Sequence, residues 1–218
     1  MVQFNRSSFA TAAVDRRALL KGAGTLAAGL ALGLPTATRA SSSTRVSLAL
    51  DWYPNSDHAG LFLAQERGYF TAASLDVKLY TPADPTTVLQ TVGAGRDTFG
   101  ISYQTDTLYA RAQNVPVVSI AALVQHPLNV LMVKKSSGIA SPAGLKGKKV
   151  GMAGVPSDEA MLKTIFKTAG ISVSDVTLVN VGYDLLPALL SGKVDGVIGV
   201  YYTHEAILAE QQGVPVIS

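Results

Sequence analysis

The sequence predicts an α/β fold with two lobes and a ligand cleft between them. Strand-like runs rich in Val, Ile and Leu alternate with helix-like runs from residue 45 to residue 218, and this alternation indicates βαβ units with a mostly parallel sheet. A Gly-rich helix end, a basic residue, an Asp and a buried strand follow one another at 93–100 and again at 191–198. Because this pattern occurs once in each half, it favours two similar lobes, in which these glycines end helices and the aspartates are structural.

The first lobe is expected at residues 41–127. Its strands are expected at 45–50, 76–80, 98–101 and 115–124, and its helices at 57–67, 84–92 and 105–113. Asp84 is a typical N-cap, and Pro85 suits the first helical position because it has no N–H to leave unpaired. Pro116 interrupts the apolar run of the last strand.

The second lobe is expected at residues 128–218, after a crossing near 125–133. Its strands are expected at 130–133, 149–152, 176–179, 194–200 and 214–217, and its helices at 158–169, 185–191 and 203–211, with a loop and a short helix at 136–146. The chain stops at Ser218, just after a strand begins. We therefore expect the second lobe to be truncated at its C-terminus.

Residues 1–40 resemble a twin-arginine-type signal peptide. The stretch 15–21, Asp-Arg-Arg-Ala-Leu-Leu-Lys, precedes an apolar run at 22–34, and this run is shorter than the roughly 20 residues that a membrane span needs. The residues Thr38-Arg39-Ala40 offer a small-x-small cleavage site. We expect cleavage after Ala40, export by the twin-arginine machinery and a soluble periplasmic protein.

The composition excludes several classes of function. Residues 1–40 hold five basic residues and one acidic residue, so the formal charge of +3 comes from this segment and gives no support for nucleic-acid binding. The chain has no cysteine, which rules out disulfides, thiolate nucleophiles, iron–sulfur ligation and a lipoprotein anchor. The three histidines have no metal-type spacing, and the nucleophile-elbow, zinc-protease and P-loop motifs are absent. We expect no metal, no cofactor and no catalytic set.

Aromatic, amide and imidazole side chains cluster where the first strand ends and the first helix begins. The stretch 51–60 is Asp-Trp-Tyr-Pro-Asn-Ser-Asp-His-Ala-Gly, and open α/β sheets bind ligands at this end of their strands. Trp52 and Tyr53 offer ring faces for stacking on a flat heterocycle, although a lone tryptophan is also a common scaffold residue. Asn55 is a candidate ligand donor or an N-cap, and His58 is a candidate pocket residue.

Two later positions add candidate ligand contacts. Tyr103 follows the third strand of the first lobe, where its ring is placed to stack on the ligand or its hydroxyl to donate to it. The alternative for Tyr103 is a surface loop residue. Ser157 begins a helix of the second lobe; it is either an N-cap or a ligand contact, because helix starts present free N–H groups.

Several motifs carry a family resemblance. They are Asp-Trp-Tyr-Pro-Asn at 51–55, Gly-Tyr-Phe at 68–70, Gln-His-Pro-Leu-Asn at 125–129, Leu-Lys-Gly-Lys-Lys at 145–149 and Pro-Ser-Asp-Glu at 156–159. From about residue 45 to its last residue, the chain resembles periplasmic binding proteins that serve ABC importers of thiamine-pyrimidine precursors. This group is related to the fungal thiamine-pyrimidine synthase and to binders of sulfonates, nitrate and riboflavin.

The resemblance implies a type II periplasmic-binding-protein fold and a monomer that delivers its ligand to an ABC permease. The implied ligand is a pyrimidine of the hydroxymethylpyrimidine or formylaminopyrimidine type. Relatives carry aromatic residues and a Glu at the positions of Tyr202 and Glu205, and a carboxylate can accept two charge-assisted hydrogen bonds from an aminopyrimidine. The alternative for Glu205 is an exposed helical residue.

Two alternatives to this function stay open. In the same class, the ligand is another solute, such as riboflavin or an alkyl sulfonate. In another class, the protein is an enzyme of pyrimidine synthesis. The resemblance argues against the enzyme, because the fungal synthase uses a cysteine-rich stretch inside the cell, whereas this chain has no cysteine and begins with an expected export signal.

Overall fold

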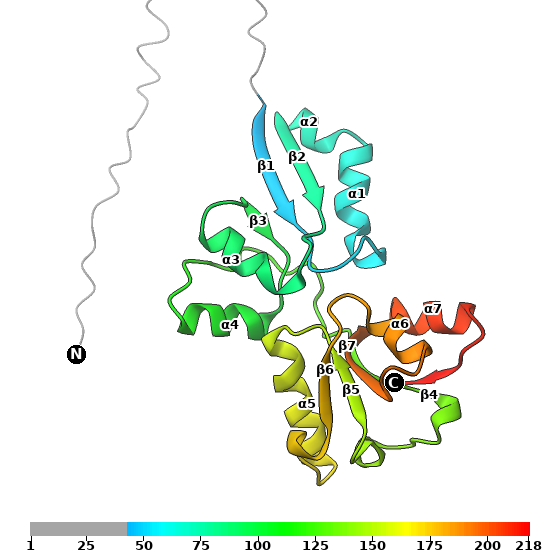
Figure 1. Cartoon of the computed structure of the whole chain (residues 1–218). Helices are drawn as coiled ribbons and strands as arrows, with labels where there is room; N and C mark the ends of the chain where they lie inside the picture. Colours follow the sequence, from blue (N-terminus) through cyan, green and yellow to red (C-terminus); the bar gives the residue numbers. More distant parts are fainter. Residues whose placement is uncertain (1–42) are drawn as a thin grey trace, which may run out of the picture. The chain divides into compact units, whose positions relative to one another are not determined.

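The computed structural model describes residues 43–218, which contain two β-sheets with helices beside them (Figure 1). We call the elements around the three-stranded sheet the first lobe and those around the five-stranded sheet the second lobe. The predicted signal peptide at residues 1–40 lies outside the described residues. Within residues 43–218, no helix has both the length and the apolar character needed to cross a bilayer.

The first lobe is built on a parallel sheet with the strand order β2-β1-β3. Its elements are β1 (Thr44–Ala49), η2 (Ser56–His58), α1 (Ala59–Glu66), α2 (Tyr69–Ala72), β2 (Leu75–Tyr80), η3 (Pro85–Thr87), α3 (Val88–Gly93), β3 (Phe99–Gly100) and α4 (Gln104–Ala112). As predicted, Asp84 caps the helix that begins at Pro85, by accepting a hydrogen bond from the N–H of Thr86. Because β1 is the central strand, the loop after it lies at the middle of the sheet edge.

The second lobe is built on a mixed sheet with the strand order β6-β5-β7-β4-β8. Its elements are β4 (Asn129–Lys134), η4 (Lys135–Ser137), η5 (Pro142–Leu145), β5 (Lys149–Met152), α5 (Pro156–Thr168), η6 (Val173–Asp175), β6 (Thr177–Asn180), α6 (Leu185–Leu190), β7 (Gly196–Tyr201), α7 (Glu205–Gln211) and β8 (Val216–Ile217). Strand β5 runs parallel to β6 and β7, whereas β4 runs antiparallel to β7 and β8. The loops after β5, β6 and β7 therefore share one sheet edge.

The prediction of a strand at 115–124 was wrong, because these residues are irregular. Pro116 has no N–H to donate to a ladder, and Val118 and Ile120 are 75% and 72% exposed, so their apolar side chains do not build a core in the described chain. The strand expected at 98–101 is confirmed but shorter, since only Phe99 and Gly100 pair with β1.

The Gly- and Asp-containing pattern that occurs in both halves has the predicted structural role. Gly95 and Gly192 have φ values of +69° and +77°, which lie in the left-handed region that glycine adopts without strain. Asp97 accepts a hydrogen bond from the tyrosine that ends β2, and Asp195 accepts one from the N–H of Lys149 at 2.9 Å. In each lobe the aspartate therefore ties the start of the strand that follows it to another strand of the same sheet, β2 in the first lobe and β5 in the second.

The apolar core of the second lobe also contains a residue from the first lobe. Strand β7 sends Val197 and Val200 into one apolar cluster and Ile198 into another. Val197 and Val200 share a face because the register of β7 against β4 shifts between Ile198 and Val200, as at a β-bulge. Trp52, which follows β1, packs in the cluster of Val197 and is 7% exposed. The loop after β1 is therefore anchored in both lobes.

Candidate ligand-binding site

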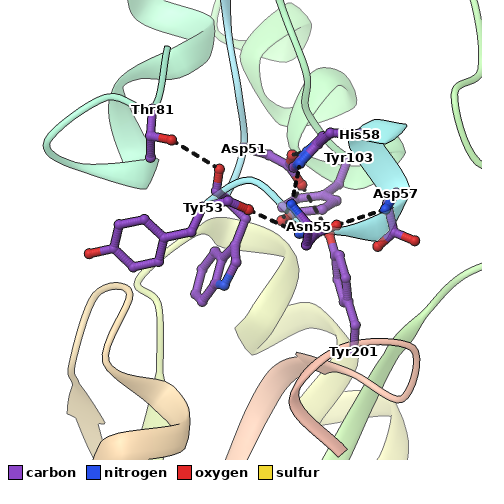
Figure 2. Close-up of polar contacts among 9 residues, drawn as sticks. Asp51, Tyr53, Asn55, Asp57, His58, Thr81, Tyr103 and Tyr201 are labelled. Atoms are coloured by element: carbon purple, nitrogen blue, oxygen red, sulfur yellow. Dashed lines mark hydrogen bonds and ion pairs between the residues drawn. The ribbon is translucent and has the colours of Figure 1, made fainter. Parts of the chain in front are cut away.

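A buried carboxylate at the end of β1 is the centre of a hydrogen-bond network (Figure 2). Asp51 is 7% exposed, and its Oδ1 lies 2.9 Å from the Nε2 of His58. Its Oδ2 accepts hydrogen bonds from the hydroxyls of Tyr103 and Tyr201, each at 3.0 Å, and the two hydroxyls lie 3.0 Å apart. Figure 2 shows Tyr201 reaching from the second lobe toward the loop that holds Asp51. The network therefore joins the two lobes.

The local turn after β1 fixes the proton position on His58. The N–H of Asn55 donates to Nδ1 of His58 at 3.3 Å, so Nδ1 carries no proton and Nε2 donates to Asp51. The side chain of Asn55 accepts from the N–H of Asp57 at 2.8 Å, which completes a capping box at η2. Of the two roles predicted for Asn55, the structure contains the N-cap.

The network stabilises the ionised form of Asp51. Burial raises the pKa of Asp51, but the hydrogen bonds from His58, Tyr103 and Tyr201 outweigh burial and leave the pKa below its ordinary value. Burial and the nearby carboxylate raise the pKa of both tyrosines. At neutral pH this site therefore contains one carboxylate and two neutral hydroxyls.

A second polar contact joins helix α4 to the start of α5. The N–H and hydroxyl of Ser157 donate to the two carboxylate oxygens of Asp106, at 2.6 and 3.0 Å, and Asp106 is 5% exposed. Next to it, Asp158 is 2% exposed and accepts from the N–H of Ala153 at 2.9 Å. Burial, with the negative charge of Asp106, raises the pKa of Asp158 to about 7; burial also raises the pKa of Asp106.

Glu205, at the start of α7, is a third buried carboxylate. It is 4% exposed and accepts a hydrogen bond from the N–H of Tyr201 at 2.8 Å. Burial raises its pKa, and the N–H of Tyr201, the neighbouring His204 and the indole of Trp52 oppose that rise only partly. The alternative of an exposed helical residue was therefore wrong for Glu205.

Aromatic rings from both lobes meet beside these carboxylates. The ring of Tyr183, in the loop after β6, lies 4.9 Å from the ring of Trp52 in an edge-to-face arrangement and 4.9 Å from the tilted ring of Tyr53. Tyr53 is 51% exposed, so one side of this aromatic group is open to solvent. The group is placed to contact a flat ligand.

Two cavities adjoin this group. The outer one has a volume of about 360 Å³, within the range of small-molecule sites. It is lined by residues of both lobes: Tyr53, Ala83, Asp84, Pro85, Ala153, Asn180, Val181, Gly182, Tyr183 and Asp184. The inner cavity, of about 20 Å³, has room for about one water molecule. Its polar lining residues are Asp51, Ser102, Tyr103, Asp106 and Asp158.

The structure brings seven of the eight predicted residues into these contacts. The seven are Trp52, Tyr53, Asn55, His58, Tyr103, Ser157 and Glu205. Tyr53 is half exposed where it lines the outer cavity, and the eighth residue, Tyr202, is 48% exposed and lines neither cavity. Among residues 43–218, no group of three or more His, Asp or Glu side chains is arranged to hold a metal ion.

Sequence reasoning missed five residues of this site: Asp51, Asp106, Asp158, Tyr183 and Tyr201. Asp51 lies in the stretch that drew attention, but its acidic side chain was not assigned a role. Tyr201 was passed over for Tyr202, although successive residues of a strand face opposite sides. The sequence of β7, Gly-Val-Ile-Gly-Val-Tyr, has no polar residue, so its hydrophobic pattern gives no alternation for choosing between these two tyrosines, although the structure buries Tyr201 and leaves Tyr202 half exposed.

Comparisons with known proteins show which family the sequence matches. The family model described as NMT1/THI5 like matches residues 55–217. The chain is 40% identical over 168 residues to the formylaminopyrimidine-binding protein of Halalkalibacterium halodurans, an alignment that covers 77% of this chain and 51% of that protein. It is 34% identical over 170 residues to the 4-amino-5-hydroxymethyl-2-methylpyrimidine phosphate synthase of Aspergillus parasiticus, covering 78% of this chain and 49% of the synthase. The chain thus spans about half the length of these relatives.

Two solved structures identify the fold. The alkanesulfonate-binding protein SsuA from Xanthomonas axonopodis pv. citri, bound to MOPS, superimposes with a TM-score of 0.65 at 17% identity, covering 81% of this chain and 60% of SsuA. The periplasmic aliphatic sulphonate binding protein SsuA from Escherichia coli gives a TM-score of 0.61 at 20% identity, with coverage of 81% and 60%. The predicted periplasmic-binding-protein fold is therefore confirmed.

Proposed function

Because the chain belongs to the NMT1/THI5-like family, we propose that it is the solute-binding component of an ABC importer and that its ligand is an unphosphorylated aminopyrimidine precursor of thiamine. The ligand binds between the lobes, against Trp52 and Tyr53, and the closed protein delivers it to the permease. The relative from Halalkalibacterium halodurans, a formylaminopyrimidine-binding protein by name, supports this ligand class.

The observation that carries the proposal is the chemistry of the cavity walls. Both cavities are lined by aromatic and acidic side chains, and neither has a lysine or arginine among its described lining residues. A sulfonate or phosphate needs cationic or N–H donors, and buried carboxylates repel it. A neutral or protonated aminopyrimidine instead offers N–H donors and a ring face, which suit carboxylates and aromatic rings. The walls therefore favour a pyrimidine over an alkyl sulfonate.

We place the predicted ligand contacts on both sides of this site. In the first lobe, Trp52 and Tyr53 stack on the ring and Tyr103 donates to it. In the second lobe, Glu205 accepts from the amino group. His58, Asn55 and Ser157 hold the neighbouring carboxylates and turns in position through the hydrogen bonds described above. Tyr202, which is half exposed, is proposed as a further ligand contact from the second lobe.

The experiment that tests the ligand is mass spectrometry of small molecules that co-purify with the full-length protein. We expect a formylaminopyrimidine or hydroxymethylpyrimidine without a phosphate group. An alkyl sulfonate or riboflavin in its place would contradict the proposed ligand class.

A second candidate function, pyrimidine synthesis, is favoured by the 34% identity to the fungal synthase. Mass spectrometry of the purified protein separates the two candidates. A binding protein holds an unphosphorylated pyrimidine, whereas a synthase holds or releases 4-amino-5-hydroxymethyl-2-methylpyrimidine phosphate, the product in the name of the fungal enzyme.

We further propose that residues 1–40 direct export through the twin-arginine machinery, with cleavage after Ala40, to give a monomeric periplasmic protein. Replacing both Arg16 and Arg17 with Lys should leave the precursor in the cytoplasm, because this route recognises the arginine pair. Fractionation followed by immunoblotting measures the distribution. A normal periplasmic yield of the double variant would show that the arginine pair is dispensable.

A further inference from the structure

Tyr183 belongs to the site by position, although the family motifs in the sequence do not include it. It lies in the loop after β6, at the same sheet edge as the loops after β5 and β7. Its ring contacts Trp52 and Tyr53 of the first lobe, and it lines the outer cavity. Tyr183 is thus the second-lobe residue that continues the aromatic wall of the first lobe.

The hydroxyl of Tyr183 is buried and has no hydrogen-bond partner among the described residues. Burial, followed by the nearby charges of Asp51 and Asp84, raises the pKa of this hydroxyl, so it stays protonated and able to donate. Most buried polar groups in proteins are paired, and an unpaired one calls for an explanation. A ligand atom beside the ring would supply a partner.

On the basis of the proposed function, we propose that Tyr183 is a ligand-binding residue. Its ring packs against the pyrimidine beside Trp52, and its hydroxyl forms a hydrogen bond with a polar substituent of the pyrimidine. The pyrimidine then contacts aromatic rings from both lobes at once. Because Tyr183 of the second lobe contacts Trp52 and Tyr53 of the first lobe, a ligand that binds to its ring also favours closure of the two lobes. The hydroxyl of Tyr183 adds selectivity for a pyrimidine that carries a polar substituent.

Two substitutions separate the ring from the hydroxyl. Tyr183→Phe keeps the ring and removes the hydroxyl, whereas Tyr183→Leu removes both. A tyrosine on α2, Tyr69, is 61% exposed and provides the matched controls Tyr69→Phe and Tyr69→Leu. The probe is 4-amino-5-hydroxymethyl-2-methylpyrimidine, titrated calorimetrically into each full-length protein, with circular dichroism to verify folding.

We expect Tyr183→Phe to raise Kd roughly threefold to tenfold, the range for one neutral hydrogen bond. Tyr183→Leu should raise Kd by roughly tenfold to a hundredfold, because the stacking contact is lost as well. Both Tyr69 variants should bind as wild type does. Wild-type binding by both Tyr183 variants would overturn the role of Tyr183 alone, whereas failure of the wild-type protein to bind the pyrimidine would overturn the proposed function and this inference with it.

Discussion

Asp51 and Asp158 are both buried carboxylates that line the inner cavity, yet their surroundings shift their pKa values in opposite directions. Asp51 has hydrogen-bond partners in His58, Tyr103 and Tyr201, and its pKa is lowered. Asp158 has backbone N–H donors and a second carboxylate, Asp106, close by, and its pKa is raised to about 7. Burial alone therefore does not decide the charge state; the kind of hydrogen-bond donor and the sign of the nearest charge also decide it.

The largest expected effect is a fall in stability as the pH rises toward neutrality. Asp158 has an unfolded pKa of 3.8 and a folded pKa of about 7, so the folded state binds the proton more tightly. The stabilisation is fully present below the unfolded pKa and is lost as the pH rises through about 7. Between pH 4 and pH 7 we expect the free energy of unfolding to fall by roughly 2–4 kcal/mol, measured by urea denaturation.

Asp158→Asn provides the control for this pH dependence. The amide has no charge to desolvate, and its oxygen can still accept from the N–H of Ala153. The variant should show a shallower pH profile than wild type and equal or greater stability at pH 8. A variant with the wild-type slope would assign the pH dependence to other groups, such as Asp106, whose pKa is also raised by burial.

At pH 8, Asp51→Asn should change the free energy of unfolding in the opposite direction to Asp158→Asn. The substitution removes a charge that accepts from His58, Tyr103 and Tyr201, and we expect a loss of about 3 kcal/mol in the free energy of unfolding. The measurement is the same urea titration, at a pH where Asp158 is ionised. Equal effects of the Asp51 and Asp158 variants would show that the two carboxylates are equivalent after all.

Glu205→Gln tests the third buried carboxylate, whose pKa is raised by burial, unlike that of Asp51. The variant keeps the size of the side chain but cannot accept two N–H groups with equal strength. We expect aminopyrimidine binding to weaken by about 1.5–3 kcal/mol, with a smaller loss for a pyrimidine that lacks the amino group. If calorimetry gives the wild-type Kd for both ligands, Glu205 is a structural acceptor for the N–H of Tyr201 and not a ligand contact.

Local patterns in the sequence predicted the parts of the molecule that depend on near neighbours. The N-cap at Asp84 and the strands of both sheets follow from turn chemistry and apolar runs that span a few residues. The strand predicted at 115–124 does not form, because an apolar run also needs a neighbouring strand to pair with, and Pro116 has no backbone N–H to donate.

The candidate site was harder to predict because its contacts join distant parts of the chain. Tyr201 reaches Asp51 across 150 positions, and Ser157 reaches Asp106 across 51. Each of these aspartates also suits a helix start or a surface position when considered locally. Their partners become evident only when the loops after β1, β5 and β7 are brought together.

The central claim is that a pyrimidine binds between the lobes beside Trp52, and the emission of this residue tests it most directly. Trp52 is the only tryptophan in the chain, so any change in indole fluorescence reports on this position. Titration of the full-length protein with 4-amino-5-hydroxymethyl-2-methylpyrimidine should quench or shift the emission, with the same Kd as calorimetry, and an alkyl sulfonate should have no effect. Calorimetric binding of the pyrimidine without any change in emission would contradict the account, because the ligand would then bind away from Trp52.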